Sequence, residues 1–504
     1  MKVESTGTVL STVFVDYDNI YLSLKRKNEE AAKRFAKDAA LWLREIESSR
    51  LITPTNGSNF SVPRRIVMSR CYGNPVPRRN ATDNSTDMNS FPFVRHHFLR
   101  AGFEVVDCPP LFDRPGNPYV NAGGQDWPDN VERFAVFARV AALLAGDALE
   151  LGWRPDVVHA HDWHTAAAVW WLATAGTADE RYRAIPTVFT VHNLMHQGHA
   201  PWDLARYLGI LTHGLAEEPY GSVNLMARGI YHATMVSTVS PTYAREVMTP
   251  EGGHGLDGLL RHRSFDLHGV LNGLDHDVWN PATDPRLAQR FDAWTLDARI
   301  ANKRALQQRM GLPQRDDVPV VGMVTRLDWQ KGMDVLGHVL HLLMSGAAGE
   351  VQFVLLGSGT PHYEDMIRHI VGYHREKAAA VLRYDGDLAP LVYGGADAFL
   401  MPSLFEPCGL AQLIAMRYGA VPVVRATGGL ADTVRDGVTG FTYHQQEVDA
   451  CWSALCRALH VCRTDIGSWR AIQRQGMGYD SSWLTSAQAY QQIYGWAIER
   501  MRGW

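Results

Sequence analysis

Between positions 320 and 332 the chain reads Val320-Val321-Gly322-Met323-Val324-Thr325-Arg326-Leu327-Asp328-Trp329-Gln330-Lys331-Gly332, which sets two cations directly after an apolar run. The run has the length and valine content of a strand buried on both faces of a parallel sheet. Arg326 and Lys331 then follow the carboxyl end of that strand, where ligands bind in open α/β sheets. A guanidinium fork and an ammonium point charge can together hold one pyrophosphate. Without further context, solvated loop cations are the preferred explanation of such a pair.

Outward from this stretch, other apolar runs of strand length are each followed by a helical pattern. Strict alternation of strand and helix predicts parallel sheets covered by helices. The pattern therefore indicates two α/β domains with a ligand cleft between them. The expected strands cover residues 156–159, 187–191, 237–239, 320–324, 351–356 and 398–402.

The first zone, residues 1–110, shows the same alternation. Strands are expected at 13–15, 66–68 and 103–107, and a helix is expected at about 21–47. Residues 73–90 are rich in Asn, Pro, Asp and Ser and predict a loop. This zone is therefore also expected to form a parallel α/β segment.

Composition excludes several classes of protein. The 504 residues carry a formal net charge of −4, which gives no electrostatic reason for bulk binding to nucleic acid or membrane. None of the six cysteines forms a C-x-x-C pair, so a zinc ribbon or redox dithiol is not expected. A signal peptide and a membrane-spanning apolar run are also not recognised, and a cytoplasmic protein is expected.

A second motif, Pro402-Ser403-Leu404-Phe405-Glu406-Pro407-Cys408-Gly409-Leu410, also follows a predicted strand. Gly409 and Leu410 would present backbone N–H groups at the start of a helix, which is a ready anion site. The Glu406 carboxylate suits a pair of sugar hydroxyls. A third motif, Thr427-Gly428-Gly429, predicts a turn that lets the backbone approach a ligand closely.

Six histidines gather at two predicted strand ends, in the segments 159–164 and 191–199. Imidazole is a good zinc ligand, but the carboxylates are not arranged as a familiar ligand set and no H-E-x-x-H helix is present. Sugar binding by Asp162 and His192 is the preferred interpretation, with core packing for the other histidines. No metal is therefore expected.

Taken together and in this order, the motifs resemble the bacterial glycogen/starch synthase family over residues 111–504. So many matches in the same order do not arise by chance, whereas a match to one short sequence motif can. Further matching segments are Leu111–Tyr119, Trp127–Asn130, Ser240–Tyr243, Gly255–Leu259, Asn272–Asp275, Trp279–Pro281, Ala415–Gly419 and Thr427–Thr433.

The resemblance implies two Rossmann-like domains in the GT-B arrangement, with an interdomain cleft. The remainder of the first catalytic domain would be 111–290, the nucleotide-sugar-binding domain 291–480, and a C-terminal helix 481–504. It also implies retaining transfer of glucose from ADP-glucose to the non-reducing end of an α-1,4-glucan, without a cofactor. UDP-glucose is the less favoured donor by this resemblance. The residues themselves do not distinguish ADP-glucose from UDP-glucose, because the base pocket has no short signature here.

Carried over by motif, Arg326 and Lys331 would hold the donor pyrophosphate and stabilise the leaving ADP. Glu406 would bind the sugar, while Asp162 and His192 would face the glucose and the acceptor. The expected catalytic residues are therefore Asp162, His192, Arg326, Lys331 and Glu406. The expected substrate-binding residues are Asn272, Cys408, Gly409, Leu410, Thr427, Gly428 and Gly429.

Residues 1–110 depart from this family, because its Lys-x-Gly-Gly-Leu phosphate-binding loop is missing from them. The segment instead resembles a truncated NYN domain, a PIN-like nuclease fold, through Phe14–Asn19 and Arg100–Pro110. Such nucleases bind a divalent metal through several carboxylates, of which Asp16 and Asp18 match. A turn capped by Asn19 explains the same residues as well.

Three hypotheses follow. The first is the glucosyltransferase, impaired by the missing loop. The second is a metal-dependent ribonuclease acting through Asp16, Asp18 and Asn19, and nucleic acid is an expected partner only in that case. The third is an inactive glucan- or nucleotide-binding protein.

Overall fold

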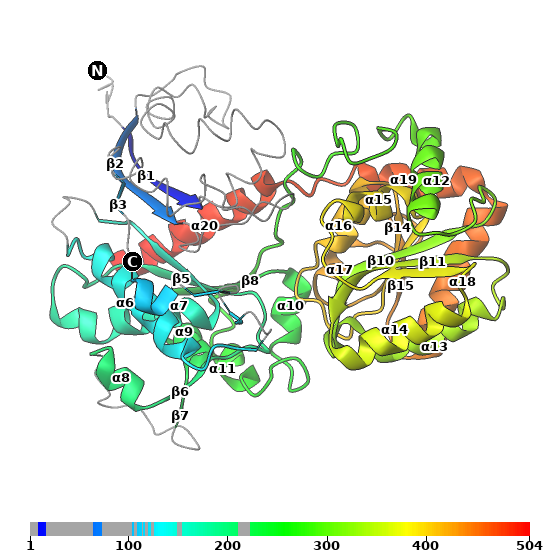
Figure 1. Ribbon diagram of the computed structural model, residues 1–504. Helices are drawn as coiled ribbons and strands as arrows, with labels where there is room; N and C mark the ends of the chain where they lie inside the picture. Colours follow the sequence, from blue (N-terminus) through cyan, green and yellow to red (C-terminus); the bar gives the residue numbers. More distant parts are fainter. Residues whose placement is uncertain are drawn as a thin grey trace, which may run out of the picture. The chain divides into compact units, whose positions relative to one another are not determined.

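A computed structural model describes residues 9–16, 64–72, 103–104, 108–112, 114–115, 119–121, 125–148, 154–209 and 222–503 (Figure 1). The chain divides into two compact units, and each is described by itself. Unit 1 comprises Met1–Pro155, Thr174–Arg183 and His199–Val223, and unit 2 comprises Asp156–Ala173, Ala184–Gly198 and Asn224–Trp504. This division cuts across the segment 111–290, and the four-part division expected from the sequence stays a prediction.

Unit 1 contains a small parallel sheet of three strands in the order β1-β2-β3. All three N-terminal strands predicted from the sequence are present, and their parallel pairing is confirmed. The helix predicted at about 21–47 and the loop at 73–90 lie outside the described residues. The main elements are β1 (Val9–Asp16), β2 (Arg64–Tyr72), β3 (Phe103–Glu104), α5 (Pro109–Phe112), α6 (Asn130–Ala145), η1 (Ala175–Ala178), β6 (His199–Pro201) and α8 (Asp203–Tyr207).

One part of unit 2 is a four-stranded parallel sheet in the order β4-β5-β8-β9. Helix α7 packs on it through an alanine- and tryptophan-rich buried stretch and lies close to α9. The elements are β4 (Val158–His161), α7 (Asp162–Ala173), β5 (Thr187–Val191), α9 (Leu225–His232), β8 (Met235–Thr238), α10 (Pro241–Glu246), α11 (Asp257–His262) and β9 (Leu267–Gly269). Strand β7 (Ser222–Asn224), which ends at the boundary of the two units, pairs with β6 in a sheet of two strands.

The C-terminal helix α20 (Trp483–Arg502) packs against this four-stranded sheet. Ile493 and Ala497 of the helix are buried in one cluster with Val188, Met235 and Val270. The predicted C-terminal helix is therefore confirmed, and its apolar positions are covered by residues more than two hundred positions earlier in the chain.

The other part of unit 2 is a six-stranded parallel sheet in the order β12-β11-β10-β13-β14-β15. The predicted strands at 320–324, 351–356 and 398–402 correspond to β10, β11 and β13. The strands are β10 (Val320–Leu327), β11 (Gln352–Gly359), β12 (Ala378–Val381), β13 (Ala398–Met401), β14 (Val421–Arg425) and β15 (Phe441–Tyr443).

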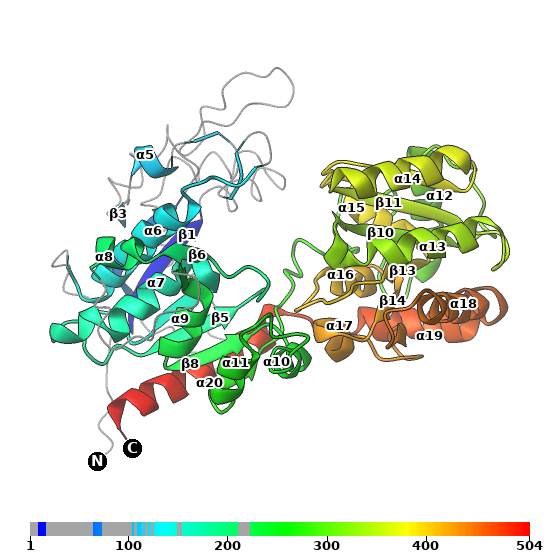
Figure 2. The same ribbon diagram turned by 90° about the horizontal axis from the view of Figure 1, so that it is seen from below.

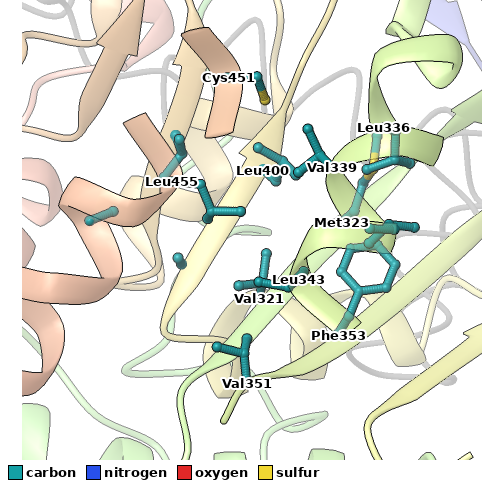
Figure 3. Packing of buried hydrophobic residues seen from close by; sticks show 14 of the residues in the cluster. Val321, Met323, Leu336, Val339, Leu343, Val351, Phe353, Leu400, Cys451 and Leu455 are labelled. Atoms are coloured by element: carbon teal, nitrogen blue, oxygen red, sulfur yellow. The ribbon is translucent and has the colours of Figure 1, made fainter. Parts of the chain in front are cut away.

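Helices cover both faces of this sheet and enclose a separate apolar core on each (Figures 1 and 2). One core joins Val321, Met323 and Phe353 of the strands to Leu336 and Leu455 of the helices (Figure 3). The helical elements are η3 (Leu296–Ala298), α12 (Arg299–Arg309), η4 (Trp329–Lys331), α13 (Met333–Met344), α14 (Pro361–Tyr373), α15 (Leu388–Gly395), α16 (Ala411–Arg417), α17 (Gly428–Thr433), α18 (Val448–Thr464) and α19 (Ile466–Met477).

The strand order decides where a ligand can bind. From β10 the chain first adds β11 and β12 on one side, and then returns to place β13 on the other side. This reversal is a topological switch point, and it opens a crevice beyond the carboxyl ends of β10 and β13. Helices of the described ranges are all too short or too polar to cross a bilayer.

Candidate functional site

A cavity of ≈ 220 Å³ lies at this switch point. Its walls come from the ends of β10 and β13, from the loop after each strand, and from the start of α16. The predicted donor-site residues Arg326, Lys331, Glu406, Gly409 and Leu410 are therefore neighbours around one cavity. The full lining is Met323, Val324, Thr325, Arg326, Lys331, Leu400, Met401, Ser403, Glu406, Gly409, Leu410 and Ala411.

Lys331 reaches the cavity because the chain turns tightly after β10. The Asp328 side chain accepts a hydrogen bond from the Lys331 backbone N–H (3.2 Å), which caps the short helix η4. Gly332 follows with φ +71°, and a Cβ there would meet the Pro402 carbonyl oxygen at 1.9 Å. Only glycine permits this crossing, which sets the Lys331 loop against the end of β13.

Glu406 forms an ion pair with Lys331. Lys331 Nζ lies 2.8 Å from Glu406 Oε1 and 2.7 Å from Oε2, and both side chains are largely buried. The Ser403 hydroxyl donates a third hydrogen bond to Glu406, at 3.0 Å. A buried carboxylate needs such partners, because loss of hydration disfavours its charge.

Arg326 differs from Lys331 in exposure. Its side chain is 64% exposed and contacts the Asp328 carboxylate at 3.2 Å. An exposed guanidinium with one carboxylate partner keeps donors available for an anion in the cavity.

The backbone of Asn272 contacts the side-chain sulfur of Cys408. The Asn272 N–H donates to Cys408 Sγ at 3.4 Å, and burial raises the pKa of that thiol to about 11. The thiol therefore stays protonated near neutral pH and has no thiolate reactivity. Among the substrate-binding residues predicted from the sequence, Asn272 and Cys408 are not in the cavity lining, whereas Gly409 and Leu410 are.

The Thr427-Gly428-Gly429 turn lies behind Glu406. Gly428 has φ +44°, a Cβ there would lie 2.0 Å from the Glu406 carbonyl oxygen, and the Gly429 N–H donates to that oxygen at 3.0 Å. The Thr427 hydroxyl and the Gly428 N–H both donate to the carboxylate of Glu246. The group that the turn approaches closely is protein backbone, and its predicted approach to a ligand stays a prediction.

Asp162 and His192 come together at the ends of β4 and β5. Asp162 Oδ1 accepts a hydrogen bond from the His192 N–H (2.8 Å), and Asp162 has φ +55°, an unusual value for a non-glycine residue. Burial raises the pKa of the Asp162 carboxyl above its ordinary value. His192 Nε2 also lies 3.0 Å from His161 Nδ1, so one ring donates and the other accepts.

His159 is held by hydrogen bonds rather than by apolar packing alone. Its Nδ1 lies 2.8 Å from the Tyr494 hydroxyl of α20, and its Nε2 lies 2.6 Å from Thr190 Oγ1. The described ranges contain no group of three or more His, Cys, Asp or Glu side chains that could hold a metal ion.

The two clusters are connected inside unit 2. Asn193, next to His192, donates through Nδ2 to the Gln330 side-chain oxygen at 3.5 Å, and Gln330 is next to Lys331. Sequence reasoning missed Gln330, Ser403 and Glu246. Gln330 and Ser403 stood inside recognised motifs, whereas Glu246 follows the matched Ser240–Tyr243 segment by three residues and gave no signal of its own.

The predicted nuclease residues are not tested by this geometry. Asp16 ends β1, whose side chains are not described, and Asp18 and Asn19 lie outside the described residues.

Comparison with known proteins agrees with this architecture. Residues 65–262 match the family described as the starch synthase catalytic domain, and residues 318–460 match the glycosyl transferases group 1. The first match begins inside the segment 1–110 that we expected to resemble an NYN domain. That finer expectation stays a prediction.

Curated relatives cover most of the chain. A glycogen synthase from Rhodopseudomonas palustris is 45% identical over 405 residues, which is 77% of this chain and 80% of the relative. A glycogen synthase from Anaeromyxobacter dehalogenans is 44% identical over 397 residues, covering 77% and 82%.

Solved structures show the same likeness. The catalytic domain of starch synthase IV from Arabidopsis thaliana, bound to ADP and acarbose, has a TM-score of 0.68 at 35% identity and covers 78% of this chain and 81% of that one. Sucrose-phosphate synthase from Thermosynechococcus elongatus has a TM-score of 0.52 at 16% identity, covering 97% and 98%. At that identity the second likeness concerns the fold alone.

Proposed function

The chain belongs to the glycogen and starch synthase family of glycosyltransferases, with a GT-B-like fold of parallel α/β sheets, and from that premise we propose its substrates and the roles of its residues. The donor is ADP-glucose, and the acceptor is the non-reducing end of an α-1,4-glucan. The likeness to a starch synthase bound to ADP and acarbose supports both substrates.

The single observation that carries the proposal is that cations and backbone N–H donors gather around the switch-point cavity. Arg326 and Lys331 offer cations, and Gly409 with Leu410 adds backbone donors next to them. The leaving diphosphate gains negative charge as the bond to the glucose C1 breaks. Donors that are already fixed around it stabilise this charge without having to reorganise, which lowers the barrier.

Lys331 changes partner when the donor binds. In the structure its charge is neutralised by Glu406 at 2.7 Å. A diphosphate in the cavity would share that ammonium, and Glu406 would then accept hydrogen bonds from sugar hydroxyls. Ser403 keeps one Glu406 oxygen oriented during this exchange, because its hydroxyl donates at 3.0 Å.

Asp162 and His192 act on the sugar and acceptor. The hydrogen bond from the His192 backbone fixes the Asp162 carboxylate at the start of α7. The imidazole of His192 is oriented separately by His161 at 3.0 Å. These contacts provide a preorganised polar surface for hydroxyl groups, with no metal required.

The direct experiment measures incorporation of labelled glucose into glycogen from ADP-glucose and, in parallel, from UDP-glucose. We expect ADP-glucose to be the better donor. The Lys331→Ala variant should lose most of the transfer, whereas Arg315→Ala should not. Arg315 is a suitable control because it lies before β10 and is paired with Asp317, away from the cavity lining. Equal loss in both variants would contradict the assignment.

The ribonuclease hypothesis depends on residues 1–110, and the family matches favour the transferase. An arm of the same experiment with RNA and Mg²⁺ or Mn²⁺ tests it. Cleavage that disappears in an Asp16→Asn variant would establish it as a second activity.

A further inference from the structure

We propose that Glu246, on α10, is a positioning residue for the donor site, acting through the Thr427-Gly428-Gly429 turn on Glu406. This inference rests on the proposed function, because it concerns the same site. It also assigns the turn a different role from direct contact with the donor.

The first observation is the set of hydrogen bonds on the Glu246 carboxylate. Oε1 accepts from the Thr427 hydroxyl at 3.0 Å, and the Gly428 N–H donates to Oε1 at 3.0 Å and to Oε2 at 3.1 Å. Thr427 is only 4% exposed, so these donors have no alternative partner in bulk water. While Glu246 occupies them, an anionic ligand cannot use the same donors.

The second observation connects the turn to Glu406. Gly428 has φ +44° and lies so close to the Glu406 carbonyl that a Cβ would meet its oxygen at 2.0 Å. The Gly429 N–H donates to the same oxygen at 3.0 Å. The Glu406 backbone is therefore supported by a turn that Glu246 holds, while the Glu406 side chain holds Lys331 at 2.7 Å.

The third observation is a reciprocal contact between the two helices. Asp432 of α17 accepts hydrogen bonds from the Thr242 N–H (2.9 Å) and hydroxyl (2.6 Å) of α10. Each helix thus supplies one carboxylate to the beginning of the other. Sliding one helix along the other would break both contacts, so the pair fixes the position of the turn in more than one direction.

A purely structural role for Glu246 makes a different prediction from a positioning role. Loss of a structural contact would lower the melting temperature and leave the properties of the folded molecules unchanged. Loss of a positioning contact would let the Glu406 backbone move, which changes donor affinity and rate even in fully folded protein.

The experiment compares Glu246→Ala and Glu246→Gln with Glu251→Ala as the matched control. Glu251 is an exposed carboxylate five positions later in the chain. The Gln variant keeps the side-chain shape and one acceptor, so it disturbs folding less than the Ala variant does and should retain part of the function. Steady-state kinetics with ADP-glucose and glycogen are measured together with ADP affinity by calorimetry.

We expect kcat/KM for ADP-glucose to fall by about tenfold to a hundredfold in Glu246→Ala, the loss of one charge-assisted contact. The decrease should be smaller in Glu246→Gln and absent in Glu251→Ala. The KM for glycogen should not change. Unaltered kcat/KM and ADP affinity in a folded Glu246→Ala protein would overturn the inference.

A second measurement does not depend on activity. In the protein without ligand, hydrogen exchange of the Gly428 and Gly429 amides should become faster in Glu246→Ala, because their acceptors are lost or displaced. Unchanged exchange would refute the inference by itself. If wild-type protein neither binds ADP nor transfers glucose, the proposed function fails, and the exchange result still decides whether Glu246 holds the turn.

Discussion

Lys331 Nζ lies 2.8 Å and 2.7 Å from the two carboxylate oxygens of Glu406, within the cavity at the switch point of the six-stranded sheet. The two side chains are 15% and 8% exposed, so water screens the pair only weakly. The cavity therefore holds a cation that Glu406 neutralises, and a diphosphate that binds there must compete with Glu406 for it.

Replacing Lys331 by Ala removes the cation and leaves Glu406 buried beside Ser403 alone. ADP affinity should fall by about 1.5–3 kcal/mol, the usual size of one charge-assisted hydrogen bond. Calorimetry with ADP measures this change. Lys377→Ala is the control, since the Lys377 ammonium donates to the Met344 carbonyl at 3.5 Å and is outside the cavity lining. An unchanged ADP affinity in the Lys331 variant would refute the donor-site assignment.

Replacing Glu406 by Gln should separate binding from chemistry. The neutral amide no longer neutralises Lys331, so ADP affinity should stay the same or increase. Glucose transfer should fall by about 10²-fold or more, because the carboxylate that orients the sugar is lost. The two quantities are measured on the same preparation, by calorimetry and by glucose incorporation. A parallel decrease in both would show that Glu406 mainly supports the local structure.

Gly428 allows a test of close backbone approach with an internal control. Gly428 and Gly437 both have positive φ, at +44° and +70°, but a Cβ at Gly437 meets nothing within 4 Å. Gly437→Ala should therefore cost only about 1 kcal/mol of stability from backbone strain. Gly428→Ala adds a clash with the Glu406 carbonyl, so ADP affinity should fall as well. Melting curves and ADP calorimetry distinguish the two effects, and equal ADP affinities in both variants would contradict this account.

These relationships show what sequence could predict. Apolar runs predicted β10, β11 and β13, because strands buried on both faces leave a strong pattern. Arg326, Lys331 and Glu406 were assigned to one site because each stands at or just after the carboxyl end of such a strand, and the structure gathers them around one cavity.

Contacts between distant segments were not predictable. Glu246 and Gly428 are separated by 182 positions, and an isolated carboxylate at the end of a short helix normally faces solvent. The pairing of His159 with Tyr494 was missed for the same reason, because only packing of α20 on β5 and β8 brings them together.

His159 should make stability depend on pH. Burial, with smaller contributions from His161 and His192, lowers its pKa to about 3, below the ordinary value of about 6.5. Between about pH 3 and pH 6.5, the unfolded chain therefore binds a proton on His159 that the folded protein does not bind. The resulting stability is present above pH 6.5 and is lost as pH falls toward 3, at up to about 1.4 kcal/mol per pH unit.

The melting temperature measured from pH 4.5 to 7.5 tests this sign. In His159→Gln the decrease on acidification should be shallower than in wild type. His338→Gln, which changes an exposed histidine of α13, should keep the wild-type slope. A steeper slope in the His159 variant would mean that the folded state favours the protonated ring.

The last prediction concerns the missing Lys-x-Gly-Gly loop of residues 1–110. In the family that this chain belongs to, the loop supplies a lysine and backbone amides beside the donor phosphates. The cations of the switch-point cavity, Arg326 and Lys331, come from β10 and its following loop and do not depend on that segment. ADP binding should therefore persist while transfer is strongly reduced, because one lost preorganised donor costs about 10²–10³ in rate. Lys25, Lys27 and Arg70 offer cations within residues 1–110, but their spacing does not reproduce the loop. Glucose incorporation into glycogen is compared for this chain and for a version that carries a family N-terminus in place of residues 1–110. Equal transfer rates for the two versions would show that other residues replace the loop. A transfer rate about 10²-fold or more higher in the version with the family N-terminus, at similar ADP affinity, would show that the missing loop acts in the transfer step.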